Sequence, residues 1–237
     1  MKWFSRSKPP DEKSPGGSLI YRHDSISAPR IGLADEAVKA FRQTRDEAYQ
    51  RLYGEAASVS HEIVPLVPHI DVITYHRIYR NGEQRRQACT LVTSGMSDLA
   101  MTLPNGIDAI RRAELIFYCD EPKQDYIDTI RWLAHFPHNQ NTCVGYYSTI
   151  PNGNPPEPFW GSPILDTILL LPPIVTKDQK LPEELVLGGD PVHFLWIVPV
   201  TTPECNLKLA KGGAALLDLF QAHHHPHIFD PGRKSYV

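Results

Sequence analysis

The chain has 237 residues, of which 41% are hydrophobic and 22% are charged, and its formal net charge at pH 7 is -3. This composition can build one sizeable core but gives no electrostatic reason to expect a nucleic-acid partner, because phosphate binding needs a clustered excess of Lys and Arg. No segment approaches the ~20 apolar residues of a membrane helix, and the basic N-terminus lacks the apolar run of a secretory signal, so we expect a cytoplasmic protein with no membrane partner.

The first part of the chain predicts an arm and then a helix. Residues 1–30 are rich in Pro, Gly, Ser and charge and lack hydrophobic periodicity, so we expect a flexible N-terminal arm. Between residues 34 and 53 the apolar side chains fall on one arc, which predicts an amphipathic helix that Gly54 can close. Arg45 falls on the apolar face, which indicates a guanidinium group that is either snorkelled or paired.

Several segments rich in β-branched and aromatic residues follow, and each predicts a strand. They cover residues 59–67, 70–79, 87–92 and 112–119, with Asn81-Gly82 as a turn between the second and the third. Residues 125–135 are then expected to form a second helix with Ile127, Ile130 and Ala134 facing inward.

Prolines punctuate the second half of the chain. We expect strands at residues 144–150 and 164–171, with a proline-rich loop at 151–158 between them. Residues 192–200 are apolar almost throughout, apart from His193. A strand without alternation is buried on both faces, so we place this one near the middle of a covered sheet.

The last predicted helix begins at Thr201 or Thr202, with Glu204 in a favourable first turn, and runs to about residue 222. It contains the unusual pair Gly212-Gly213, although each Gly costs roughly 1 kcal/mol relative to Ala inside a helix. We attribute the pair to close packing between this helix and the sheet.

The order of these elements predicts the fold class. Helices are separated by clusters of strands, without regular alternation of strand and helix, so we predict an α+β fold with a mixed β-sheet flanked by helices. No linker divides residues 31–222, which we expect to form a single compact domain, followed by a C-terminal tail at 223–237.

Cysteine and histidine spacing gives no sign of a metal or cofactor. The four cysteines contain no CxxC pair, so we expect free thiols, as in a reducing cytoplasm, without a disulfide framework or a zinc site. The histidine run at residues 223–227 is interpreted as a solvated tail, because consecutive residues on a tail point in different directions. We therefore expect no cofactor.

Two segments begin like catalytic motifs and then depart from them. A zinc-protease helix starting at His61-Glu62 would need a second His where Pro65 stands. An elbow for a nucleophilic serine starting at Gly95 would need Gly where Leu99 stands, because only Gly allows the tight turn from strand to helix.

A metal-dependent hydrolase remains an alternative. It would draw on His61, His69 and Asp71, together with Glu62 and His76. On a strand, His69 and Asp71 share one face whereas His76 lies on the other, which disfavours a single cluster.

A set of ordered segments resembles the suppressor-of-fused family. The most characteristic is LVTSGMS at residues 91–97, followed by Met101, and FLWIVPVT at 194–201 resembles the final strand of the family domain. Further matching segments are RAELIFY (112–118), LAHFP (133–137), TIPNG (149–153), GSP (161–163) and LLLPP (169–173). The segments occur in family order over roughly half of the chain.

This resemblance implies a mixed α/β fold without enzymatic activity. Animal members have two lobes that close around a peptide, which joins as an added strand, whereas this chain resembles the first lobe alone. Short single-lobe members are bacterial, and many are regarded as immunity proteins that neutralise toxins. We therefore expect a non-enzymatic bacterial immunity protein that binds a protein partner, either a toxin domain or a peptide segment. A scaffold protein without a toxin partner is a further alternative.

The candidate contact surface combines two segments, because an exposed sheet edge can accept an added strand and large aromatic side chains dominate interface energies. Its residues are Thr93, Ser94, Met96, Ser97, Asn152, Phe159 and Trp160. The competing interpretation is purely structural: residues 93–97 form a tight turn that ends a strand, and Phe159 and Trp160 cap the core.

Overall fold

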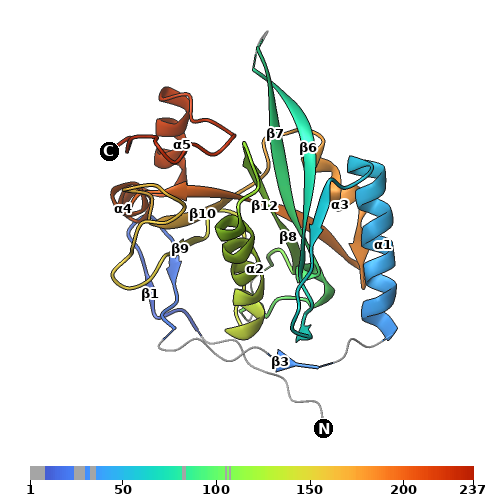
Figure 1. Cartoon of the computed structure of the whole chain (residues 1–237). Helices are drawn as coiled ribbons and strands as arrows, with labels where there is room; N and C mark the ends of the chain where they lie inside the picture. The colour runs from blue at the N-terminus through green and yellow to red at the C-terminus, as the bar shows by residue number, and fades with distance from the viewer. Residues whose placement is uncertain (1–8, 24–29, 33–35, 82–83, 105, 107) are drawn as a thin grey trace.

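The computed structural model describes residues 9–23, 30–32, 36–81, 84–104, 106 and 108–237. Its largest element is an eight-stranded sheet in the order β4-β6-β7-β8-β12-β10-β9, with β11 paired to the start of β12 (Figure 1). The strands are β4 (Ser58–Ser60), β6 (Asp71–Asn81), β7 (Gln84–Ser94), β8 (Arg112–Cys119), β9 (Thr149–Pro151), β10 (Thr167–Leu171), β11 (Val186–Leu187) and β12 (Asp190–Val200). β8 and β12 run parallel and the other neighbours antiparallel, so the sheet is mixed, as predicted.

Helices cover both faces of this sheet, which confirms the predicted α+β class. They are α1 (Glu36–Tyr53), α2 (Gln124–Asn139), α3 (Leu181–Glu184), α4 (Thr202–Lys211) and α5 (Gly213–Ala222), with 3-10 turns η1 (Met96–Asp98) and η2 (Asp178–Lys180). Buried side chains of α1, α3 and α5 join one apolar cluster, and those of α2 join a second. The two clusters fill the two sides of one sheet.

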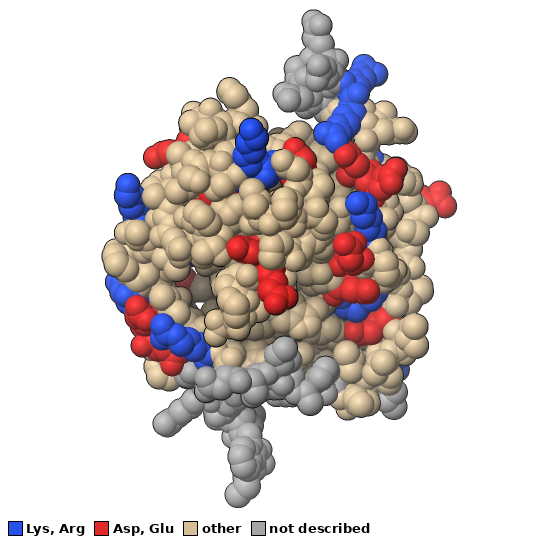
Figure 2. Space-filling model, turned by 60° about the vertical axis from the view of Figure 1, so that its left-hand side comes forward, with Lys and Arg blue, Asp and Glu red and all other residues tan. Residues whose placement is uncertain are grey.

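The N-terminal hairpin lies against α4. It consists of β1 (Glu12–Lys13) and β2 (Leu19–Ile20), and the backbone N–H of Gly16 donates to the carbonyl of Leu209 at 2.7 Å. Residues 9–23 thus differ from the flexible arm that we expected, while residues 1–8 and 24–29 lie outside the described part. Figure 2 brings this side of the molecule forward and shows acidic and basic side chains interspersed between broad uncharged areas.

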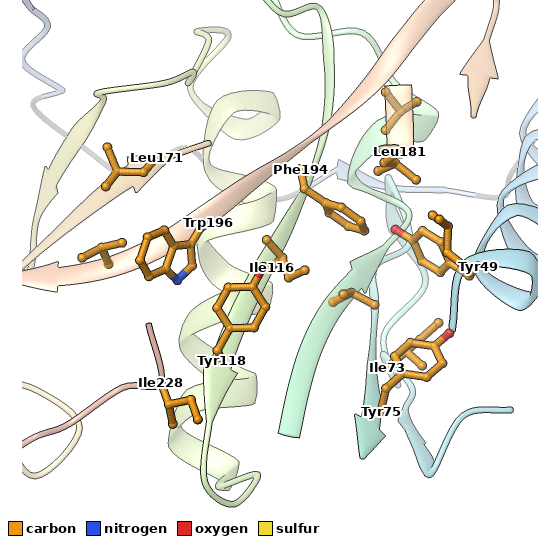
Figure 3. Close-up of a cluster of buried hydrophobic side chains, with 14 of the residues drawn as sticks. Tyr49, Ile73, Tyr75, Ile116, Tyr118, Leu171, Leu181, Phe194, Trp196 and Ile228 are labelled. Carbon is orange, nitrogen blue, oxygen red and sulfur yellow. The ribbon is translucent and has the colours of Figure 1, made fainter. Parts of the chain in front are cut away.

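The central strand β12 explains why its sequence does not alternate. Phe194 and Trp196 belong to one buried cluster, and Leu195 and Ile197 to the other. Figure 3 shows the first cluster, in which Phe194 and Trp196 meet side chains such as Tyr49 and Tyr118. Apolar residues are therefore favoured at every position of a strand that has no solvent-facing side, as predicted for residues 192–200.

The segment expected as one strand at residues 59–67 is divided between two sheets. Its first part, β4, pairs with β6 at the edge of the main sheet. Its last part, β5 (Leu66–Val67), pairs with β3 (Arg30–Ile31) in a separate two-stranded sheet. The expected turn at Asn81-Gly82 falls between β6 and β7, and Gly82 lies outside the described residues.

The last predicted helix is two helices, α4 and α5, separated at Gly212. Gly212 has a φ of 91°, which an L side chain rarely adopts and which ends α4. A Cβ on Gly213 would approach the ring of Tyr147 to 2.8 Å. The expected first turn is present, since the side chain of Thr201 accepts from the N–H of Glu204 and the Glu204 carboxylate accepts from the N–H of Thr201.

The C-terminal segment packs onto the domain. Ile228 is buried in the first apolar cluster, and the guanidinium of Arg233 pairs with buried Glu204 at 2.7 Å. The ring of His225 stacks on Phe220 with centroids 4.1 Å apart. The segment 223–237, which we expected to be a tail, thus packs against the domain. Within the histidine run that we expected to be solvated, His223 and His224 are exposed whereas His225 and His227 are half-buried.

Candidate functional site

A groove of about 1290 Å³ lies beside β9, at one edge of the main sheet. Its walls come from the N-terminal hairpin, the outer side of α2, the segment 142–156 and the facing side of α4. These elements are neighbours on the left of Figure 1, although they come from four separate parts of the chain. The groove is therefore created by the fold, and no single motif marks it.

The edge strand β9 gives this groove backbone groups that can pair with another strand. Residues 144–150 were expected to form a strand, but the observed strand, Thr149–Pro151, overlaps that segment only at Thr149 and Ile150. β9 pairs with β10 on one side, and no strand of the described residues pairs with its other side. An edge of this kind presents backbone N–H and C=O groups to an incoming segment.

The groove is lined by aromatic and apolar groups with few charges. Trp132 and Phe136 of α2 lie on one wall, and their rings are 5.7 Å apart. Tyr146 and Tyr147 lie beside β9. The charged side chains among the described lining residues are those of Arg22 and Lys208, and none of these lining residues is Asp or Glu.

The candidate contact residues Thr93, Ser94, Met96 and Ser97 lie inside the protein. Thr93 Oγ1 donates to Glu114 Oε2 at 2.6 Å, and the Ser97 hydroxyl donates to Glu114 Oε1 at 2.5 Å. With these side chains inside, a partner has no direct access to them. The interpretation of residues 93–97 as a turn that ends a strand is the one that fits the structure, since β7 ends at Ser94 and η1 follows.

A buried charge cluster accounts for that turn. Arg45 of α1 pairs with Asp98 of η1 and lies 3.8 Å from Glu114 of β8, so the guanidinium on the apolar face is paired, one of the two expected outcomes. Burial raises the pKa of Asp98 to about 6, although the charge of Arg45 opposes the increase. The cluster ties α1 to the sheet.

The three remaining candidate contact residues differ in their accessibility to a partner. Asn152 is exposed, and its side-chain N–H donates to the carbonyl of Glu157 at 2.7 Å, which holds the proline-rich loop together. Trp160 is buried, and its indole N–H donates to Thr129 Oγ1 at 3.0 Å. Phe159 is half-buried against Trp160. Of these three, Asn152 is the most accessible to a partner.

The histidines and carboxylates of the hydrolase alternative do lie together. His61 Nδ1 and His69 Nε2 are 3.0 Å and 3.3 Å from the Asp71 carboxylate, and His135 Nε2 is 2.7 Å from Glu62. Even so, no group of three or more His, Cys, Asp or Glu side chains among the described residues has the geometry of a metal site.

The remaining histidine of that alternative lies elsewhere. His76 contacts the thiol of Cys89 at 3.4 Å, away from the cluster around Asp71, as its position in the strand predicted.

Sequence reasoning missed the side chains that shape the groove. Trp132 is 42% exposed on the outer side of α2, and a large aromatic residue at a predicted solvent-facing position was a signal that was available. Lys208 carried no such signal, because a lysine on a helix is usually solvated. In the described part of the chain, no helix has both the length and the apolar character needed to cross a membrane.

Comparison with solved structures shows a shared fold. A SUFU homolog from Neisseria gonorrhoeae FA 1090 matches with a TM-score of 0.59 and 17% identity, over 84% of this chain and 98% of that one. The Sufu-Fu complex matches with a TM-score of 0.55 and 10% identity, over 84% and 92% of the two chains. Drosophila Suppressor of Fused matches with a TM-score of 0.52 and 11% identity, over 91% of this chain and 54% of that one.

The sequence itself matches a family description. No curated protein matches it. The family model for Suppressor of fused protein (SUFU) matches residues 67–234, which is most of the chain and includes the segments in which we found the resemblance. This chain therefore belongs to the suppressor of fused protein (SUFU) family.

Proposed function

We propose that this protein is a non-enzymatic binding module that takes up an extended segment of another protein in the groove beside β9. The observation that carries the proposal is the coincidence of an edge strand with a groove of about 1290 Å³. Small-molecule pockets are typically about 300–1,000 Å³, so this groove has room for several residues of a peptide. Its aromatic walls offer contacts for apolar side chains.

The backbone of Thr149 is the expected point of attachment. In antiparallel strands, residues that bond to the neighbour alternate with residues that face away. The N–H of Asn152 donates to the carbonyl of Asp166 at 2.8 Å, and the carbonyl of Ser148 accepts from the N–H of Leu170 at 2.9 Å. The alternation directs the backbone N–H and C=O of Thr149 away from β10, toward an added strand.

The similar structures support a protein partner. One of them is a complex of Sufu with Fu, so a protein with this fold can bind another protein. The narrower proposal, that the partner is a bacterial toxin which this protein neutralises as an immunity protein, rests on the resemblance of the sequence to the short single-lobe members of the family. The match to a homolog from Neisseria gonorrhoeae shows that a bacterial protein shares the fold. The four cysteines are free thiols, which fits a protein of a reducing compartment such as the cytoplasm.

Two variants of one residue test the binding mode. Thr149→Pro removes both the side-chain hydroxyl and the outward backbone N–H of residue 149, and it leaves the hydrogen bonds between the residues on either side and β10 in place. Thr149→Ala removes the hydroxyl but keeps the N–H. Affinity for the partner should be at least about tenfold lower for Thr149→Pro than for Thr149→Ala, because only the proline variant lacks the outward backbone donor. Equal affinities for wild type and Thr149→Pro would refute β9 as the attachment point.

The toxin proposal needs a separate test. The protein is co-expressed with a toxin domain encoded by a neighbouring gene, and cell survival is measured with wild type and with Thr149→Pro. Protection by wild type alone supports neutralisation through β9. If the two proteins form a stable complex that can be purified but the cells still die, the immunity function is ruled out. The protein would then be a binding or scaffold protein that does not neutralise the toxin.

A further inference from the structure

Lys208 is a buried lysine at the groove without an acidic partner. It lies on α4, is 4% exposed, and lines the groove together with Cys205 and Thr149. Its ammonium group is 3.5 Å from Thr149 Oγ1, the limit of hydrogen bonding. Among the described residues, no carboxylate lies within ion-pair distance of it.

Burial without an acidic partner disfavours the charged form of the Lys208 ammonium group. Burial lowers the pKa of Lys208, because the charged form loses hydration that no neighbouring carboxylate replaces. Lysines are almost never fully buried unless they are paired. A negatively charged group from outside the chain would supply the missing partner.

The other charged group in the groove is already compensated. The Arg22 guanidinium lies 2.7 Å from Glu12 Oε2 within the N-terminal hairpin. Because the described lining residues include no Asp or Glu, the uncompensated charge of the groove is positive and is concentrated at Lys208. The groove is therefore complementary to an apolar segment that carries one negative charge.

The position of Thr149 specifies where that charge would lie. Its hydroxyl points toward Lys208, so its side chain lies on the α4 side of β9. In paired strands, directly opposite residues project to the same face with Cβ atoms about 4.5–5.5 Å apart. The residue of an added strand that pairs with Thr149 would therefore project toward the ammonium group.

We infer that Lys208 and Thr149 form a subsite for the carboxylate of one Asp or Glu in the bound peptide, at the position opposite Thr149. This inference rests on the proposed function, since it requires a peptide beside β9. The neighbouring apolar residues of the peptide would contact the rings of Trp132 and Phe136, and the acidic residue would fix the register of the strand.

Selection from a random peptide library on phage tests the inference with the full-length protein. Clones are selected on wild type and counter-selected on Thr149→Pro, which leaves peptides that need the β9 edge. We expect these peptides to share one Asp or Glu flanked by apolar residues. Selection on Lys208→Met should lose the acidic position and keep the apolar ones, whereas Lys211→Met, an exposed lysine on the same helix, should retain both.

A double-mutant cycle completes the test. Replacing the shared acid by its amide in a synthetic consensus peptide should weaken binding to wild type at least about tenfold and leave binding to Lys208→Met almost unchanged. Peptides without a shared acid, or equal losses in both proteins, would overturn the role of Lys208 while leaving β9 as a binding edge. If no peptide depends on the β9 edge, both the subsite and the proposed binding mode are wrong.

Discussion

The buried guanidinium group of Arg233 donates hydrogen bonds to both oxygens of the Glu204 carboxylate, at 2.8 Å and 2.7 Å. Glu204 also accepts from the backbone N–H groups of Thr201 and Tyr236. Burial alone would raise the pKa of Glu204, but these hydrogen bonds and the charge of Arg233 lower it overall. This one contact joins the C-terminal segment to the start of α4, which forms a wall of the groove.

Arg233→Met should destabilise the protein strongly. The substitution leaves the Glu204 carboxylate buried without its counter-charge, and breaking a buried pair typically costs about 3–5 kcal/mol. Urea unfolding followed by circular dichroism measures the change. Arg86→Met serves as the control, because Arg86 and Asp120 form an exposed pair worth about 0–1 kcal/mol. Similar losses in both variants would contradict the role of burial.

We expect the protein to lose stability in acid because His225 is buried in its neutral form. Burial, reinforced by the charge of Arg233, lowers the pKa of His225 from 6.5 to about 3. Between these values the unfolded chain binds a proton that the folded protein does not, so the contribution of neutral His225 is complete above pH 6.5 and is lost as the pH falls toward 3. The melting temperature should therefore decrease over that range.

His225→Phe should flatten this acid-dependent decrease, since Phe keeps the stacking on Phe220 and has no proton to gain. It also removes the contact of His225 with the Tyr236 hydroxyl, so its stability near neutral pH should be somewhat lower. His223→Phe is the matched control at an exposed histidine of the same segment. An equally steep decrease in wild type and in His225→Phe would show that another group causes it.

Gly95→Ala should prevent normal folding. Gly95 has a φ of 130°, and a Cβ there would overlap the carbonyl oxygen of His69. Backbone on both sides has to move, so we expect a loss of at least about 3 kcal/mol or insoluble protein. Gly17→Ala, also at positive φ but with open space around it, should cost only about 1 kcal/mol. Soluble yield and urea midpoints compare the two variants.

Lys208→Met should stabilise the isolated protein. It removes a buried charge that has no acidic partner and keeps a flexible side chain of similar length, so we expect a gain of about 1 kcal/mol in the free energy of unfolding. Lys211→Met at an exposed position should stay within about 0.5 kcal/mol of wild type. A loss of stability in Lys208→Met would show that the ammonium group has a stabilising partner within the fold.

The histidine–carboxylate cluster around Asp71 should be structural. Neither EDTA nor added Zn²⁺ should shift the melting temperature, because the described side chains lack the geometry of a metal site. Asp71→Asn should destabilise the protein by about 1–3 kcal/mol through its lost charge-assisted contacts with His61 and His69. Metal bound in a fixed ratio to untagged protein, with a melting temperature lowered by EDTA, would revive the hydrolase alternative.

The sequence alone determined the features that depend on neighbours along the chain. The helical arc predicted α1, the unbroken apolar run at residues 192–200 predicted a strand covered on both faces, and Thr201 with Glu204 predicted the start of α4. Helix and strand periods and capping contacts act within a few residues, so a single sequence contains them.

Only the tertiary structure decided which positions are accessible. Residues 93–97 resemble an exposed turn, but Glu114, on the neighbouring strand, binds Thr93 and Ser97 and places them inside. The groove forms where the N-terminal hairpin, α2, β9 and α4 meet, and Lys208 is buried because Thr149 and Cys205 lie beside it. Contacts between distant segments depend on strand order and helix docking, which local residue patterns do not specify.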